Sequence, residues 1–302
     1  MRVLLPHEEG PGLIGDVPDH VELGVWTGAG DPADAAEVEF WVPPFLATDA
    51  LNPVMASMPR LKVIQLLSAG ADAWVGRVPR VVTLCDARGV HSSSTSEWAA
   101  TAVLASLRDF PRFAVAQAAG RWDHIMTGEL AGQRVLIVGA GAIGDALAAR
   151  LAPFEVEIVR VARSARDGVH AVEELPDLLP AADVVVLLVP LTDATRGLVD
   201  ADFLARMPAG ALLVNAARGP VVDTDALVAE LSKGRLRAAL DVTEPEPLPA
   251  GHPLWDVPGL LLTPHVAGSV RGLLPRAYAL VAGQLRRYVD GQPLDNVVAD
   301  GY

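Results

Sequence analysis

The feature that most restricts what this chain can fold into is a glycine-rich turn between an apolar run and a helix-like stretch. The apolar residues Val135–Val138 lead directly into Gly139-Ala-Gly141-Ala-Ile-Gly144, after which the residues favour a helix. A strand that turns into a helix through glycines at this spacing is typical of the first unit of a doubly wound parallel sheet. We therefore expect a strand over Arg134–Val138 and a helix over Ala142–Leu151.

Each of the three glycines has its own physical reason in such a turn. Gly139 permits the tight turn, Gly141 lets the backbone approach a pyrophosphate, and Gly144 lets the helix pack closely on the strand. The pyrophosphate would lie at the N-terminus of the helix, where Ala142 and Ile143 are the first helical residues. The turn therefore predicts a dinucleotide cofactor, whereas an ordinary glycine-rich turn is the simpler alternative.

Short apolar runs alternate with helix-like stretches along the rest of the chain, which indicates parallel α/β units. Before the glycine turn, strands are expected at Val3–Leu5, Val21–Val25, Glu39–Val42, Leu61–Leu67 and Val81–Leu84. After it, strands are expected at Val156–Val161, Asp183–Val189, Leu212–Asn215, Leu236–Asp241 and Leu260–Thr263. Helices are expected at Asp31–Glu37, from Ser94 or Thr95 to about Arg108, and at Leu273–Val289.

The charge and the cysteine content limit the partners. A formal net charge of −13 repels nucleic acid and anionic membranes, so we expect neither as a partner. The longest apolar run, Val184–Val189, is too short to span a membrane, and the N-terminal run is too short for a signal peptide, so a cytoplasmic location is expected.

Cys85 is the single cysteine and is expected to be a small buried residue. The histidines show no metal-ligand spacing, and no metal is expected.

A basic segment stands where an acidic residue is usual in NAD enzymes, about 20 residues after the glycine turn. The sequence there reads Val161-Ala-Arg163-Ser164-Ala-Arg166. The planar guanidinium group of arginine can donate two hydrogen bonds to phosphate oxygens, which suits the 2′-phosphate of NADP. We therefore predict that NADP(H) is the preferred cofactor and that NAD(H) is possible, with a solvated basic turn as the alternative.

Polar segments follow three later strands at the point where each strand ends. They are Asn215-Ala216-Ala217-Arg218, Asp241-Val-Thr-Glu-Pro-Glu246-Pro and Thr263-Pro-His265-Val-Ala-Gly268. The carboxyl ends of the strands form the edge at which an open α/β sheet binds its ligands. An arginine, an acid and a histidine are therefore expected to converge near a bound nicotinamide.

These motifs, in this order, resemble those of the D-isomer-specific 2-hydroxyacid dehydrogenase family over nearly the whole chain. Leu187-Leu-Val189-Pro190-Leu-Thr192, Thr195-Arg-Gly197 and Gly128-Glu-Leu130 match further signatures of that family. The resemblance implies an oxidoreductase that interconverts a small 2-keto acid and its D-2-hydroxy acid, and a homodimer.

The resemblance also implies a fold and a division into domains. The fold class is α/β, with two doubly wound parallel-sheet domains and a cleft between them. A flavodoxin-like substrate domain is expected over residues 1–93 plus 270–302. A Rossmann nucleotide-binding domain is expected over residues 94–269, and the last helix is expected to return to the first domain.

Roles for the polar residues follow from the same resemblance. Arg218 would hold the substrate carboxylate and polarise the keto oxygen. His265 would protonate the developing alkoxide in reduction and act as the base in oxidation. Glu246, which directly precedes a proline at the family's spacing, is preferred over Glu244 as the acid that pairs with this histidine. Asp241 would hydrogen-bond the nicotinamide carboxamide.

Further residues are expected to contact the ligands. Cofactor contacts are predicted for Val189, Pro190, Thr195, Ala216, Ala217, Arg218, His265 and Gly268. The segment Ser68-Ala69-Gly70 resembles the family's substrate loop, whose backbone N–H groups would bind a carboxylate. The segment around Trp41 resembles the glyoxylate/hydroxypyruvate reductase subgroup, in which this tryptophan lines a small pocket, and core packing is the equal alternative.

The predicted function is therefore that of an NADP(H)-dependent glyoxylate/hydroxypyruvate-type reductase. Alternatives are a family dehydrogenase for phosphoglycerate, formate, phosphite or a bulkier 2-hydroxy acid, a non-catalytic dinucleotide-binding regulator, and a protein that binds a methyl donor. The set of Arg218, Glu246 and His265 argues against the last two, since binding alone needs no acid–base pair. Arg60, Lys62 and Arg77 leave a phosphorylated substrate open.

Overall fold

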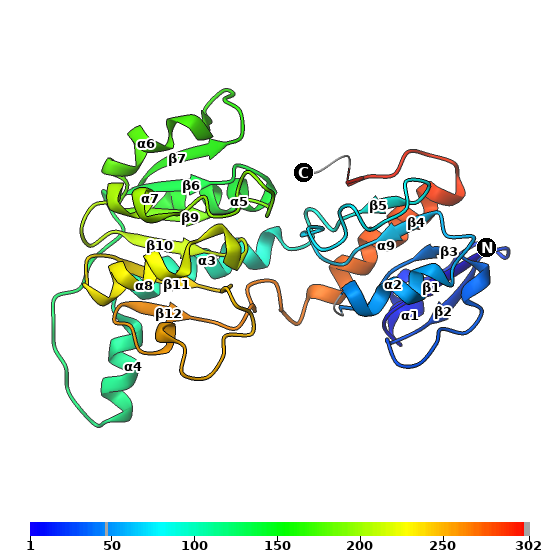
Figure 1. Cartoon of the computed structure of the whole chain (residues 1–302), viewed down its shortest axis with the longest axis horizontal. Helices are drawn as coiled ribbons and strands as arrows, with labels where there is room; N and C mark the ends of the chain where they lie inside the picture. The colour runs from blue at the N-terminus through cyan, green and yellow to red at the C-terminus, as the bar shows by residue number, and fades with distance from the viewer. Residues whose placement is uncertain (46–47, 299–302) are drawn as a thin grey trace. The chain divides into compact units, whose positions relative to one another are not determined.

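The computed structural model describes residues 1–45 and 48–298, which form two compact units (Figure 1). The first unit contains Met1–His91 and the C-terminal stretch from Arg271 onward, and the second contains Ser92–Val270. Each unit is built on one parallel sheet, so the predicted α/β class with two parallel-sheet domains is confirmed. Among the described residues, no helix is both long enough and apolar enough to span a membrane.

The first unit contains a five-stranded sheet in the order β2-β1-β3-β4-β5, with every neighbouring pair parallel. This is the strand order of flavodoxin-like sheets. The strands are β1 (Arg2–Leu5), β2 (Glu22–Val25), β3 (Val38–Trp41), β4 (Val63–Gln65) and β5 (Thr83–Cys85).

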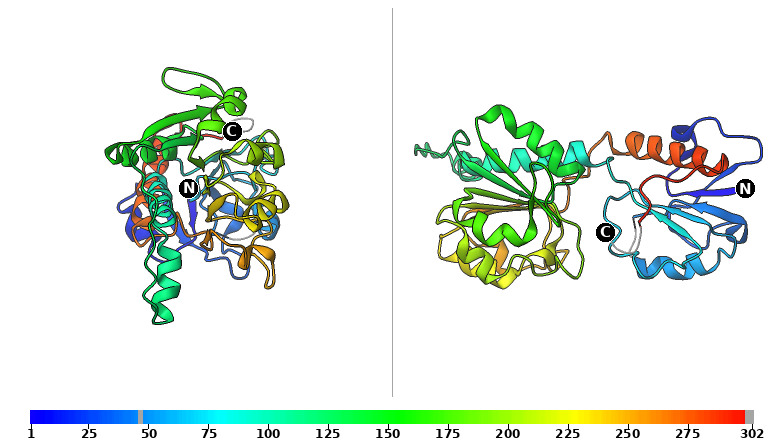
Figure 2. Two further views of the ribbon diagram at one scale, coloured as in Figure 1. Left: turned by 90° about the vertical axis from the view of Figure 1, so that its left-hand side faces the viewer. Right: turned by 90° about the horizontal axis from the view of Figure 1, so that it is seen from above.

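Helices cover both faces of this sheet, as the right-hand view of Figure 2 shows. They are α1 (Gly10–Ile14), α2 (Thr48–Ala56) and α9 (Leu273–Val289). Val3 and Leu5 of β1 pack in one apolar cluster with Tyr278 of α9, whereas Leu4 packs in another with Leu51 of α2. The last helix therefore returns to the first sheet, as predicted.

The second unit contains a seven-stranded parallel sheet in the order β12-β11-β10-β9-β6-β7-β8. Strand order reverses between β6 and β9, and such a switch point is where doubly wound sheets bind ligands. The strands are β6 (Arg134–Val138), β7 (Glu157–Ala162), β8 (His170–Ala171), β9 (Val184–Leu187), β10 (Leu212–Asn215), β11 (Arg237–Leu240) and β12 (Leu260–Leu262).

Alternate residues of β6 face opposite sides of this second sheet. Val135 and Ile137 pack with α3 (Ser92–Leu107) and α5 (Ala142–Leu151). Leu136 and Val138 pack on the side that carries α6 (Leu175–Leu178), α7 (Ala201–Arg206) and α8 (Thr224–Ser232). In Figure 1, α4 (Phe110–Ala118) projects from the rest of this unit. Short 3-10 helices lie at Ala152–Phe154, Val172–Glu174, Leu179–Ala181, Gly219–Val221 and Pro253–Trp255.

Several local predictions differ from the structure. The helix expected over Asp31–Glu37 is wrong, since only a 3-10 turn over Ala35–Glu37 forms there. A segment of this length gains few hydrogen bonds for the cost of starting a helix. Four further elements, α1, α2, α4 and β8, were not predicted from the sequence. In α2 the interior Pro53 argues against a helix, but Leu51 is buried in the core, and its packing outweighs that local preference.

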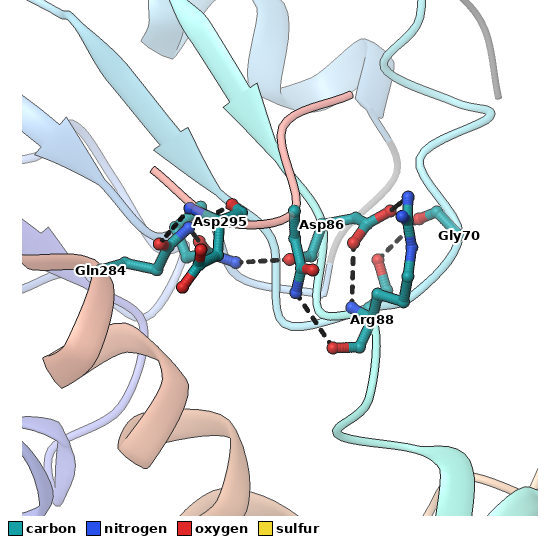
Figure 3. Close-up of polar contacts among 8 residues, drawn as sticks. Gly70, Asp86, Arg88, Gln284 and Asp295 are labelled. Carbon is teal, nitrogen blue, oxygen red and sulfur yellow. Dashed lines mark hydrogen bonds and ion pairs between the residues drawn. The ribbon is translucent and has the colours of Figure 1, made fainter. Parts of the chain in front are cut away.

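A buried polar network joins the C-terminal segment to the sheet of the first unit (Figure 3). The amide nitrogen of Gln284, on α9, donates to Oε1 of Gln65 at 2.9 Å and to the carbonyl of Asp295 at 2.7 Å. The backbone N–H of Asp295 donates back to Oε1 of Gln284 at 2.9 Å. Beside this network, Cys85 is buried as predicted, and burial raises the pKa of its thiol to about 12, which keeps it protonated.

Candidate active site

The glycine turn after β6 has the geometry of a dinucleotide cradle. Gly139 has φ +117°, and a Cβ there would lie 2.5 Å from the carbonyl carbon of Leu188. A Cβ on Gly144 would lie 2.2 Å from the carbonyl oxygen of Gly139, so only glycine fits either position. Among the described residues outside its own turn, nothing lies within 4 Å of a Cβ built on Gly141. Open space over Gly141, at the N-terminus of α5, fits the phosphates of a dinucleotide.

The basic segment after β7 lies against the same turn. Arg163, Ser164 and Arg166 are all exposed. The Nη2 of Arg166 donates to the carbonyl oxygen of Ala140, inside the glycine turn, at 2.5 Å. The guanidinium of Arg166 therefore lies at the turn, and Arg163 is exposed in the same segment, which in this fold is the region that receives the adenosine end of a dinucleotide.

The acid and the histidine are in direct contact at the carboxyl edge of the second sheet. Nδ1 of His265, after β12, lies 2.6 Å from Oε1 of Glu246, after β11. The two side chains are 49% and 40% exposed. A carboxylate on Nδ1 fixes the ring orientation and directs Nε2 toward a reacting group, the arrangement a general acid–base histidine needs. Glu246, the acid preferred over Glu244 from the sequence, is the one that lies here.

Arg218 follows β10 on a turn held by a buried amide. Asn215 is 1% exposed, and its Nδ2 donates to the carbonyl of Arg218 at 3.0 Å. Its Oδ1 accepts from the N–H of Ala217 at 2.9 Å, and Nη1 of Arg218 donates to the carbonyl of Ala217 at 2.8 Å. No role was predicted for Asn215 from the sequence. A polar residue at the end of the apolar strand Leu212–Asn215 was the available signal.

The loop that carries Arg218 makes a close backbone contact with the loop that leads to Glu246. A Cβ on Gly219 would lie 1.9 Å from the carbonyl oxygen of Thr243 and 2.2 Å from its carbonyl carbon. Only a glycine allows this approach of two backbones. The position of Glu246 is therefore coupled to the turn that carries Arg218.

Asp241 begins the loop after β11 and is 2% exposed. Its carboxylate accepts hydrogen bonds from the segment that carries His265, including the N–H groups of Val266 and Ala267. The carboxylate is thus turned toward the loop of the histidine. The predicted contact with the cofactor carboxamide stays a prediction.

The remaining predicted cofactor residues lie at the same sheet edge. After β9, Oγ1 of Thr195 donates to the carbonyl of Pro190 at 2.6 Å, which closes the loop that starts at Val189. The N–H of Leu188 donates to the carbonyl of Val138 at 2.8 Å and ties that loop to the glycine turn. Ala216, Ala217 and Gly268 lie after β10 and β12, next to Arg218 and His265 in the chain.

The predicted substrate residues belong to the first unit. Ser68, Ala69 and Gly70 are partly exposed in the loop after β4, where Oγ of Ser68 donates to the carbonyl of Gly70 at 2.8 Å. Trp41 is completely buried, with its ring against Trp26 and Trp74. These contacts are those of a core residue, and a role for Trp41 in substrate binding stays an untested prediction.

An ion pair between the buried Asp86 and the exposed Arg88 lies beside the substrate loop (Figure 3). The N–H of Ala87 donates to the carbonyl of Ser68 at 2.8 Å. The carboxylate of the neighbouring Asp86 accepts from the N–H of Arg88 at 2.9 Å and from its guanidinium at 3.3 Å. Burial raises the pKa of Asp86, and the contacts with Arg88 oppose that rise.

Comparisons with known proteins agree with this geometry. Residues 100–267 match the family model described as "D-isomer specific 2-hydroxyacid dehydrogenase, NAD binding domain". Glyoxylate reductase of Thermofilum pendens is 36% identical over 263 residues, which are 82% of this chain and 78% of that protein.

Two solved structures are similar over the whole chain. A D-isomer specific 2-hydroxyacid dehydrogenase from Xanthobacter autotrophicus Py2, in complex with NADPH and MES, has a TM-score of 0.84 at 33% identity, covering 99% of this chain and 98% of that one. An NADPH-dependent glyoxylate/hydroxypyruvate reductase from Sinorhizobium meliloti, in complex with NADP and sulfate, has a TM-score of 0.83 at 27% identity, with the same coverage.

Proposed function

Because this chain belongs to the D-isomer specific 2-hydroxyacid dehydrogenase family, and so is an NAD(P)-dependent oxidoreductase, we propose that it reduces glyoxylate or hydroxypyruvate with NADPH. The observation that carries the chemistry is the 2.6 Å contact between Nδ1 of His265 and Glu246. The names of the relatives from Thermofilum pendens and Sinorhizobium meliloti support the choice of substrate.

In the proposed reaction, the residues of the second unit orient the keto acid and move one proton. The chemistry that a bound NADPH supplies is hydride transfer to the keto carbon. Arg218 donates charge-assisted hydrogen bonds to the carboxylate and the keto oxygen, which orients the substrate and polarises the carbonyl. His265 gives its Nε2 proton to the oxygen as negative charge develops there, while Glu246 stabilises the protonated ring. In the oxidative direction the same nitrogen accepts the proton.

The test of this proposal is the loss of absorbance at 340 nm with NADPH or NADH and a set of 2-keto acids. We expect turnover with NADPH and either glyoxylate or hydroxypyruvate. Turnover only with phenylpyruvate or 3-phosphohydroxypyruvate would keep the mechanism and replace the substrate. NADPH binding without turnover of any 2-keto acid would contradict the proposal and favour a dinucleotide-binding regulator.

We propose NADPH over NADH because Arg166 contacts the glycine turn, because Arg163 is exposed in the same basic segment, and because the similar Xanthobacter structure holds NADPH. Arg163→Ala is expected to raise the KM for NADPH by about 10- to 100-fold, the loss of one hydrogen bond between charged groups. The KM for NADH is expected to change little, because NADH has no 2′-phosphate. Arg206→Ala, which removes an exposed arginine at the end of α7, is the matched control. An unchanged KM for NADPH in Arg163→Ala would remove the basis for this preference.

A homodimer is also part of the proposal. Phe110 and Val115 of α4 are 59% and 65% exposed, and Trp122 and Met126 after it are 97% and 95% exposed. Large apolar side chains gathered along a projecting element are typical of a surface that another protein covers. Sedimentation equilibrium is expected to give twice the chain mass of 31.7 kDa, and a mass of one chain would contradict this part.

A further inference from the structure

We infer that Asp241 is a positioning residue for His265 and acts through the backbone of the loop Thr263–Ala267. This inference rests on the proposed role of His265 as the proton donor. It differs from the contact with the nicotinamide carboxamide that the family resemblance implies for Asp241.

The Asp241 carboxylate gathers three donors from one short loop. Its Oδ1 accepts from Oγ1 of Thr263 at 2.6 Å and from the N–H of Val266 at 2.9 Å. Its Oδ2 accepts from the N–H of Ala267 at 2.8 Å. The donors lie on both sides of His265 in the chain. One side chain therefore fixes the backbone before and after the histidine.

The backbone of Asp241 adds two more contacts. Its carbonyl accepts the N–H of His265 at 2.7 Å, and its own N–H donates to the carbonyl of Asn215 at 3.0 Å. Asn215 in turn holds the turn that carries Arg218. Asp241 thus lies between the two loops that present the arginine and the histidine.

His265 needs such restraint because its backbone is in the left-handed region, with φ +53°. Residues with a side chain adopt this conformation uncommonly and at a cost in free energy. If the bonds to Asp241 were lost, the loop would relax toward an ordinary conformation and the ring would move away from Glu246. A displacement of about 1 Å of a catalytic group can lower turnover by about 100-fold.

The burial of Asp241 supports its role in positioning the loop that carries His265. The residue is 2% exposed, and a carboxylate taken out of water needs hydrogen-bond donors to offset the loss of hydration. The loop supplies three of them. These three hydrogen bonds within the protein are therefore enough to orient the carboxylate of Asp241.

The experiment measures kcat and the KM for NADPH in two variants. In Asp241→Asn, an amide N–H₂ replaces one carboxylate oxygen, and this donor faces a backbone N–H that needs an acceptor. Thr263→Val removes only the hydroxyl donor. We expect kcat to fall about 10- to 100-fold in Asp241→Asn and by a smaller factor in Thr263→Val, with the KM for NADPH within about 2-fold of the wild type. Asp202→Asn, which removes an exposed carboxylate in the first turn of α7, is the control.

Two outcomes would overturn the inference. A KM for NADPH raised about 10-fold or more with kcat retained would make Asp241 a cofactor ligand. A kcat close to wild type in both variants would mean that the loop holds His265 without this carboxylate. Circular dichroism of each variant confirms that it is folded before its kinetics are compared.

A second readout needs no turnover. In protein with ¹⁵N-labelled histidine rings, the signal of His265 is identified by its loss in His265→Asn. In Asp241→Asn we expect that signal to shift or broaden while those of the other histidines stay in place. An unchanged His265 signal would overturn the inference. A wild-type protein that turns over no keto acid would instead refute the proposed function, and the two failures are therefore distinguishable.

Discussion

Replacing His265 by asparagine is expected to lower kcat for keto-acid reduction by about 10²- to 10⁴-fold, the usual contribution of a positioned general acid. Asparagine fills similar space but cannot deliver a proton at the position of Nε2. The KM for NADPH is expected to change little, because the glycine turn and the basic segment lie on other strands. Steady-state kinetics at 340 nm with saturating NADPH measure both quantities.

Two further variants are compared with His265→Asn, one at its partner Glu246 and one as a control. Glu246→Gln keeps a hydrogen-bond acceptor near Nδ1 but removes the charge that stabilises the protonated ring, so it is expected to lower kcat less than His265→Asn. His20→Asn, at an exposed position of the first unit, is expected to keep wild-type turnover. Wild-type kcat in His265→Asn would exclude this residue as the proton donor.

Gly219→Ala is expected to have the second large effect, through the backbone alone. The added Cβ would lie 1.9 Å from the carbonyl oxygen of Thr243, so one of the two loops must move. Overpacking of this kind costs about 1–3 kcal/mol, and more where the neighbour is backbone that cannot rotate away. Since the loop at Thr243 leads to Glu246, turnover is expected to fall by about 100-fold or more.

Thermal unfolding and kcat are to be measured together for this variant. The matched control is Gly283→Ala, in the interior of α9, where a Cβ meets no described atom within 4 Å. That change is expected to stabilise the protein by about 0.5–1 kcal/mol, because alanine favours a helix over glycine. If Gly219→Ala unfolds at the wild-type temperature and keeps its activity, the two loops are not coupled as described.

The sequence predicted best those elements whose apolar pattern coincides with burial in the structure. The helices Ala142–Leu151 and Leu273–Val289 and the strand Leu212–Asn215 have the predicted bounds. In each, the apolar positions face a core, so local preference and packing agree. Elements that packing imposes against local preference were missed, as α2 with its interior proline illustrates.

The candidate site was predictable in its residue types but not in its supports. A motif can suggest that His265 and Glu246 act together, because their spacing from strand ends is a sequence property. It cannot show that Asp241 turns toward the histidine loop, or that Gly219 touches Thr243. Those contacts join segments more than twenty residues apart and depend on how neighbouring loops leave the sheet.

The segment Asn296–Val298 beside β5 has a consequence for how the first sheet can associate with other molecules. The N–H of Val298 donates to the carbonyl of Leu84, and the N–H of Asp86 donates to the carbonyl of Asn296, at 2.9 Å and 3.0 Å. Cys85 and Val297 pair in an antiparallel bridge. An outermost strand with unsatisfied backbone groups invites strands of other molecules to add to the sheet. Here residues Asn296–Val298 already occupy the β5 edge, so this edge of the first sheet is closed to an added strand.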